Sequence, residues 1–123
     1  MFLNKSSELR WKIVSYTRNS SRFVPARSGV YLVVKPTRFL GVIQETEILY
    51  VGKSRNLQLR MKQHLNPRSE HNKSLNQANG RGKFEFWYDF FSPEQISDAE
   101  KFLIQNLNPK YNLIWRKKNE RTK

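Results

Sequence analysis

Two apolar stretches in the first half of the chain have the composition of β-strands. Residues 29–35 read GVYLVVK, and residues 41–52 read GVIQETEILYVG. Both are rich in Val, Ile, Leu and Tyr, most of them residue types that pack well on a pleated surface. Because the connection between them is short, they predict an antiparallel hairpin, with Pro36 ending its first strand.

A third strand is predicted over residues 83–91, which read KFEFWYDFF. Aromatic residues occupy every second position there, so they share one face of the strand. They are Phe84, Phe86, Tyr88 and Phe90. We interpret this face as core, whereas an exposed Trp87 could instead stack on a single-stranded nucleic acid.

Apolar residues with helical spacing occur after the predicted hairpin and also near the start of the chain. Leu57, Met61 and Leu65 recur at every fourth position, which predicts a helix over residues 56–65. Residues 6–17 are expected to form a short helix with Ser6 as its N-cap.

A further helix is predicted from the sequence SPEQ onward. Ser92 can cap it, Pro93 fits its first position, and Gln95 completes a capping box. The helix is expected to run to Asn108, because Pro109 cannot continue it. Residues 111–115 are an open candidate for a short last strand.

These elements predict the order α-β-β-α-β-α in a single domain, which suits a length of 123 residues. The fold class expected is α+β, with a small three-stranded, mostly antiparallel sheet flanked by helices.

The net charge of the chain indicates which class of partner it binds. The chain has 23 Lys and Arg residues against 10 Asp and Glu residues, a formal net charge of +13. Nucleic acid is the leading candidate partner, because neutralised phosphates release counterions. An anionic membrane surface competes, but we find no basic helix with a wide apolar face and no apolar run long enough to span a bilayer. Cysteine is absent, which excludes thiolate metal sites, and the cytoplasm is the expected location because no signal peptide is recognisable.

Arg60 and His64 lie one turn apart on the helix expected at 56–65, so they share a face that borders its apolar stripe. A solvated helix surface would explain either residue alone. Together they are candidates for chemistry on a phosphate, with Arg60 for phosphate charge and His64 for proton transfer or phosphate contact.

Glu100 projects into the apolar stripe formed by Ile96, Ala99, Leu103 and Leu107. A carboxylate that faces a core is costly unless a cation compensates it. A structural salt bridge is one interpretation. A Mg²⁺ site is the other, because this ion is commonly bound through one or two carboxylates together with waters and substrate phosphate.

These residues together resemble the GIY-YIG nuclease family. The first signature stands as GVY at 29–31 and the second as YVG at 50–52. A lysine, a helical arginine, a histidine one turn on, a glutamate on a later helix and an asparagine after a Pro-x-Tyr complete the resemblance. These positions match Lys53, Arg60, His64, Glu100 and Asn112. The connection between the signatures is longer than in compact family members and suggests an extended hairpin.

The resemblance implies a three-stranded sheet with both signature tyrosines facing a cleft that also contains the arginine helix and the glutamate. Arg60 and His64 would line the rim of this phosphodiester site, and the reaction would be single-metal hydrolysis. Glu100 would hold one Mg²⁺ or Mn²⁺, Tyr31 would act as general base, and Arg60 would stabilise the phosphate. Tyr50 would position the nucleophile or phosphate, and Asn112 would support the site. The residues expected to act in catalysis are Tyr31, Tyr50, Lys53, Arg60, His64, Glu100 and Asn112, and those expected to bind nucleic acid are Lys53, Arg55, Arg60 and Lys62.

The resulting expectation is a metal-dependent DNA endonuclease that leaves 5′-phosphate and 3′-hydroxyl ends with low intrinsic sequence specificity. Residues 1–27 would form an N-terminal extension with a short helix, residues 28–115 the nuclease core, and residues 116–123 a basic tail. Open alternatives are a module that no longer cuts and an RNA-directed basic protein. The choice between single- and double-stranded DNA, and a protein partner that supplies specificity, also stay open.

Overall fold

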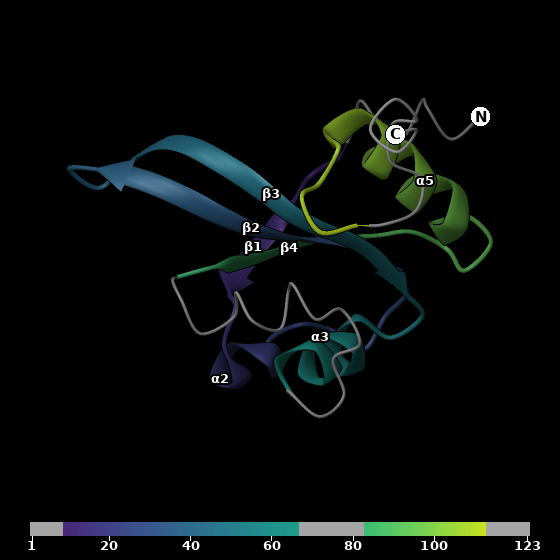
Figure 1. The fold of residues 1–123 in the computed structure, drawn as a ribbon. Helices are drawn as coiled ribbons and strands as arrows, with labels where there is room; N and C mark the ends of the chain where they lie inside the picture. The colour runs from purple at the N-terminus through teal and green to yellow at the C-terminus, as the bar shows by residue number, and fades with distance from the viewer. Residues whose placement is uncertain (1–8, 67–82, 113–123) are drawn as a thin grey trace.

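The computed structural model describes residues 9–66 and 83–112. Within them, one antiparallel sheet contains four strands in the order β1-β4-β2-β3. Their bounds are β1 Lys12–Ser15, β2 Gly29–Phe39, β3 Val42–Ser54 and β4 Glu85–Phe90. The α+β class is therefore confirmed, with one more strand than the sequence predicted, and β3 lies at an edge of the sheet (Figure 1).

Within residues 9–17, the extra strand stands where a helix was expected; residues 6–8, with the expected N-cap Ser6, lie outside the described residues. Lys12–Ser15 is extended and pairs with β4, with Ile13 opposite Trp87. The helical interpretation is wrong because the free edge of β4 needs backbone partners, which an extended segment provides and a helix cannot. A short helix, α2 Arg18–Ser21, follows the strand, capped by the Thr17 side chain.

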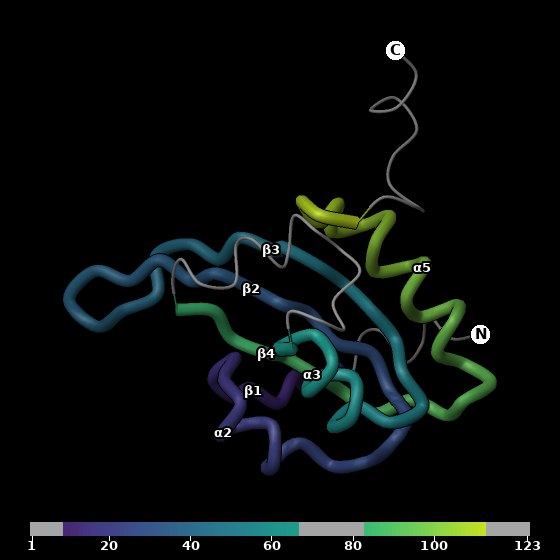
Figure 2. Tube along the Cα trace, turned by 60° about the horizontal axis from the view of Figure 1, so that its bottom comes forward, coloured from purple at the N-terminus to yellow at the C-terminus, as the bar shows by residue number. Residues whose placement is uncertain are grey.

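Helices cover the two faces of the sheet separately. Helix α3 (Leu57–Leu65) lies on one face together with α2, and α5 (Ile96–Leu107) lies on the other (Figures 1 and 2). The face under α3 buries Tyr31, Val33 and Phe86, while the face under α5 buries Leu32 and other aliphatic residues. As predicted, Phe84, Phe86 and Tyr88 lie in the core, with Phe90 packed at its margin.

The helix after β4 begins later than predicted. Its first residue is Ile96, no side chain caps it, and the backbone N–H of Gln95 instead donates to the carbonyl of Ser92 within a turn. The capping-box prediction is therefore wrong. The end was predicted well, since Asn108 adopts a left-handed conformation just before Pro109. Leu107, expected in the buried stripe, is exposed, and Ile104 is buried instead.

The hairpin between the signatures is extended, as the long connection suggested, but its first strand is longer than predicted. Pro36 does not end β2, which continues to Phe39, while β3 starts at Val42. Pro36 is tolerated because, beyond Val34, β2 has a paired strand on one side only. Leu40 and Gly41 form the turn with positive φ angles, 55° and 82°, as tight hairpins require. The ribbon projects past the rest of the sheet (Figure 1).

None of the helices in the described ranges has both the length and the apolar character needed to cross a bilayer.

Candidate active site

Tyr31 and His64 form a buried pair between the sheet and α3. The Tyr31 hydroxyl lies 2.5 Å from Nε2 of His64, and both side chains are almost fully enclosed. The Tyr31 ring stacks on Phe86 at 5.0 Å between centroids. Tyr50 completes the cluster, with its ring 5.3 Å from the imidazole and 6.2 Å from the Tyr31 ring. The two signature tyrosines thus lie on neighbouring strands, as expected.

The environment of Tyr31 keeps its hydroxyl protonated. Burial raises the pKa of Tyr31 well above its usual value, and the neighbouring Tyr50 adds to this effect. Arg60 opposes both, through its charge and through a hydrogen bond to the phenol. Tyr31 is therefore a neutral phenol at pH 7 in this structure, and it has a neighbouring imidazole nitrogen that can accept its proton.

His64 does not lie at the rim of the site, where the resemblance placed it. Its side chain is 0% exposed and packs with Leu57 and Met61 on the inner face of α3. The rim prediction is wrong because a buried phenol supplies the hydrogen-bond partner that lets an imidazole leave water. Arg60 is half-buried and also donates from Nη1 to Oε1 of Gln63, at 3.3 Å.

Glu100 and Lys53 form a second group. Lys53 Nζ donates to Ser97 Oγ at 2.8 Å and lies 3.9 Å from Oε1 of Glu100. The Glu100 side chain is 15% exposed, and desolvation raises its pKa although Lys53 lowers it. Ser97 was not anticipated, although it precedes Glu100 by three residues and so shares its helical face.

The Glu100 carboxylate suits a divalent cation. Its charge is poorly compensated, because within the described ranges the only cation within 4.0 Å is Lys53, at nearly that limit. The same part of the chain contains no cluster of three or more His, Asp or Glu side chains that could enclose a metal. A hard cation that keeps most of its water and uses one carboxylate, such as Mg²⁺, fits this donor set. Glu100 is the residue that would hold it.

Asn112 is buried against β3. Its Oδ1 accepts from the backbone N–H of Val51 at 2.8 Å, and its Nδ2 donates to the Val51 carbonyl at 2.7 Å. The buried amide therefore pairs with β3 as a neighbouring strand would, between Tyr50 and Gly52. Residues 113–115 of the expected last strand lie outside the described residues, and Tyr111 and Asn112 are not in a strand.

The two groups lie on opposite faces of the edge strand β3. Tyr50 and Gly52 face α3, whereas Val51 and Lys53 face α5, as their pairing with Val33, Tyr31, Leu32 and Val30 requires. The signature tyrosines and Glu100 therefore do not share one cleft on one face, as the resemblance implied, and the candidate site has parts on both faces of β3.

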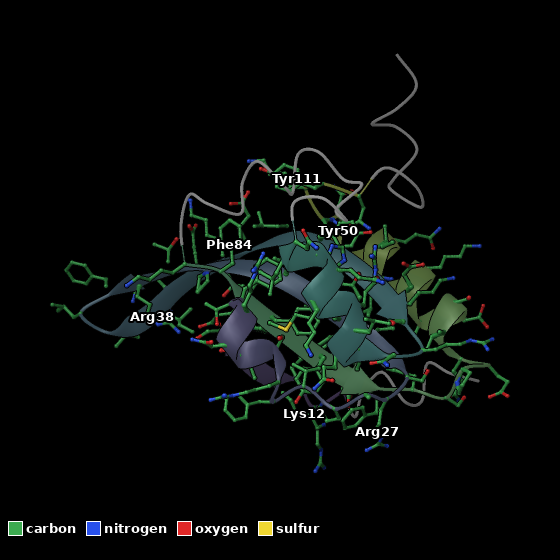
Figure 3. All side chains as sticks on the ribbon, turned by 90° about the horizontal axis from the view of Figure 1, so that it is seen from below. Lys12, Arg27, Arg38, Tyr50, Phe84 and Tyr111 are labelled. Carbon is green, nitrogen blue, oxygen red and sulfur yellow. The ribbon has the colours of Figure 1, made fainter. Side chains whose placement is uncertain are left out.

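Exposed cations occur on α3 and in the segments just before β2 and just after β3. Arg55 and Lys62, both expected to bind nucleic acid, are exposed. Arg55 lines an open hollow of about 550 Å³ together with Arg27, a residue that the sequence did not single out. Arg27 and Lys12 both lie over the Phe90 ring, at 3.8 and 5.0 Å from its centroid (Figure 3). Trp87 is not an exposed platform, since it packs under α5 and its Nε1 donates to Glu85.

Comparisons with known proteins agree with this geometry. The family model of the GIY-YIG catalytic domain matches residues 27–112. Similar solved structures include the GIY-YIG N-terminal endonuclease domain of UvrC from Thermotoga maritima bound to its catalytic divalent cation, magnesium. It shares 22% identity and a TM-score of 0.59, covering 78% of this chain and 94% of that chain. A tyrosine-to-phenylalanine mutant of that domain gives 22% identity and a TM-score of 0.57 over 78% and 93% of the two chains.

A search of curated protein sequences gave no match. The family model nevertheless covers both signature strands, α3, α5 and Asn112, and it spans most of the chain. The chain therefore belongs to the GIY-YIG nuclease family.

Proposed function

We propose that this endonuclease hydrolyses DNA phosphodiesters with the help of one divalent cation, leaving 5′-phosphate and 3′-hydroxyl ends. The observation that carries the proposal is the arrangement around β3. A buried phenol–imidazole pair lies on one face, and a shielded, poorly compensated carboxylate lies on the other. The net charge of +13 supplies affinity for the polyanion.

Arg60 is suited to hold the scissile phosphate. Its guanidinium is half-buried beside Tyr31, where a planar fork of donors can bind two phosphate oxygens. The charge it supplies is worth most as negative charge accumulates on phosphorus. A Mg²⁺ or Mn²⁺ ion held by Glu100 would stabilise the departing 3′ oxygen.

Tyr31 and His64 are suited to move the proton of the attacking water. A phenol with a raised pKa does not release its proton alone, but it can pass that proton to Nε2 of a neutral His64 while accepting one from water. The water oxygen then forms a bond to phosphorus as the bond to the 3′ oxygen breaks. The 3′ oxygen takes a proton from solvent, and His64 later returns its extra proton to solvent.

Lys53 is suited to steady the Glu100 carboxylate and to bind a phosphate oxygen, since its amine lies between Ser97 and Glu100. The hollow lined by Arg27 and Arg55 offers further charge for a flanking phosphate. Phosphate contacts carry no sequence information, which supports low intrinsic specificity. A cytoplasmic site of action is part of the same proposal.

The test compares the wild-type chain with Tyr31→Phe and Glu100→Gln on plasmid DNA, single-stranded DNA and RNA. Each substrate is incubated with Mg²⁺, with Mn²⁺ or with a chelator, and product ends are identified by ligation and by phosphatase sensitivity. We expect DNA cleavage by the wild type with either metal and none with the chelator. Undiminished cleavage by folded Glu100→Gln, or cleavage confined to RNA, would contradict the proposal.

A further inference from the structure

The free part of the hairpin, residues 35–47, is referred to here as the arm. It is a two-stranded ribbon, because β4 pairs with β2 only as far as Val34, opposite Glu85. On the other side, the described backbone bond nearest the tip joins Lys110 to Ile48. Among the described residues, two ion pairs tie the arm to the rest of the domain, from Arg38 to Glu85 at 2.9 Å and from Lys110 to Glu47 at 3.7 Å. The arm projects from the sheet (Figure 1), although isolated two-stranded ribbons are only marginally stable in water.

The tip of the arm is apolar and exposed. Phe39, Leu40, Val42 and Ile43 are 65%, 86%, 59% and 43% exposed. They surround a two-residue turn that contains Gly41. Four adjacent large apolar side chains at the end of a projection are unusual on a protein surface and indicate a contact surface.

The backbone edges of the arm are poor sites for adding another strand. Pro36 lacks an N–H, and β3 carries irregularities opposite Val33/Val34 and Thr37/Arg38. Prolines and bulges are the features that protect exposed strand edges from pairing. The side chains at the tip are therefore the part of the arm that contacts a partner.

The arm also differs from the rest of the chain in charge. It carries two cations, Lys35 and Arg38, and two anions, Glu45 and Glu47, so its net charge is 2 − 2 = 0. The whole charge of +13 therefore lies outside it. The body of the protein holds phosphates, and a neutral apolar tip is suited to the unpaired or unstacked faces of nucleobases, where apolar side chains insert as wedges.

We propose that the tip of the arm inserts at an unstacked position of the nucleic acid and so selects where the enzyme cuts. The inference rests on the proposed function, because it assigns the arm a contact on the same substrate. In β2 the side chains alternate without a bulge, so Phe39 faces the same side of the ribbon as Tyr31.

The spacing of residues along β2 predicts the distance between the unstacked position and the cleaved bond. Tyr31 and Phe39 are eight residues apart on one strand, which corresponds to about 26 Å at about 3.3 Å per residue. Stacked nucleotides advance about 3.4 Å each along one strand. The unstacked position selected by the arm should therefore lie about seven or eight nucleotides from the cleaved bond.

The experiment maps cleavage of DNA duplexes that carry a two-nucleotide bulge at different places in one sequence. Wild-type cuts should follow the bulge at a constant separation of about seven or eight nucleotides. The variant Phe39→Ser/Leu40→Ser should lose this preference by about tenfold and should still cut the duplexes, at positions that do not follow the bulge. The matched control, Ile13→Ser/Phe23→Ser, removes two exposed apolar residues elsewhere and should keep the preference. Cuts placed independently of the bulge, or a tip variant that keeps the spacing, would overturn the proposal.

A second measurement is independent of catalysis. Binding of Glu100→Gln protein should increase the fluorescence of 2-aminopurine placed beside the bulge, and the added tip substitutions should abolish the increase. If no DNA is cut but the signal appears, the proposed function fails, while the insertion of the arm at an unstacked position stands. If the tip substitutions instead convert a wild-type dimer to a monomer in sedimentation, the arm binds a second copy and the proposal is wrong.

Discussion

Gly52 lies directly opposite Tyr31, and the phenol fills the space that a side chain at position 52 would occupy. The two residues are paired between β3 and β2, and a Cβ on Gly52 would overlap the hydroxyl and ring of Tyr31. The glycine of the second signature is therefore required by the tyrosine of the first. The two motifs constrain one packing arrangement, although twenty residues lie between Tyr31 and Gly52 in the sequence.

Gly52→Ala is expected to cost about 1–3 kcal/mol of stability, because it forces an overpacked contact in the core. The cost should disappear in a Tyr31→Ala background, since all three nearest atoms belong to Tyr31. Urea denaturation of the four proteins in this cycle measures the coupling. Gln44→Ala on the exposed part of β3 is the control. An equal cost of Gly52→Ala in the wild-type and Tyr31→Ala backgrounds would contradict the packing explanation.

Asn112→Ala is expected to cost about 1–3 kcal/mol, because it leaves two backbone groups of Val51 without partners. Amide hydrogen exchange at Val51 should accelerate more than exchange at Leu32 on the neighbouring strand. The stability loss should exceed the loss in the single-turnover rate constant of the folded protein. A rate loss without faster exchange at Val51 would instead assign Asn112 to the chemistry.

Arg60→Ala is expected to lower the single-turnover rate constant by about 10²–10³ at saturating DNA, as loss of a transition-state donor does. Arg60→Lys should recover only part of the rate, because lysine keeps the charge and lacks the planar fork. Lys62→Ala, an exposed change on the same helix, is the control and should affect mainly binding. Full recovery by lysine would mean that a point charge is sufficient at this position.

Glu100→Gln is expected to remove the stabilisation that a divalent cation gives the wild-type protein. Binding to the native state alone raises the melting temperature with cation concentration. Calorimetric scans with and without Mg²⁺ should therefore show a shift for the wild type and none for the variant. Asp98→Asn, on the exposed side of α5, is the matched control and should retain the shift.

Tyr31 is expected to make the protein less stable in alkali. The folded-state pKa of Tyr31 is raised by burial, so the unfolded chain loses this proton first. The stability linked to the neutral phenol is full below about pH 10 and is lost as the pH rises toward the folded pKa. Urea denaturation between neutral and alkaline pH should show a shallower decline for Tyr31→Phe. Tyr88→Phe is a useful comparison, because burial also raises the pKa of Tyr88.

The central sheet and α3 could be predicted from sequence because local pattern and tertiary environment agree there. Leu57 and Met61 recur with helical spacing, and Asn56 caps the helix as its residue type favours. The N-terminal segment failed because its spacing suited a helix, while the unpaired edge of β4 required a strand. That requirement comes from residues 70 to 76 positions away and leaves no local signal.

The candidate site was predicted unevenly for a similar reason. Glu100 could be located because a carboxylate in an apolar stripe breaks the periodic pattern. The burial of His64 on α3 could not be predicted, since its hydrogen-bond partner, the phenol of Tyr31, comes from β2. Ser97 and Arg27 share their surroundings with anticipated residues, but their types are common in this basic, polar chain, so only the fold distinguishes them.

The attachment of residues 110–112 to β3 determines how short a working version of this domain can be. The last helix of the described chain ends at Leu107. A truncation placed there would keep every helix and strand described, yet it would remove the backbone bonds from Lys110 and Tyr111 to β3 and both bonds from Asn112. The strand that carries Tyr50 and Lys53 would then have an open outer edge. A functional boundary chosen by secondary structure alone would fall five residues too early, so shortened versions for expression or crystallisation should extend at least through Asn112.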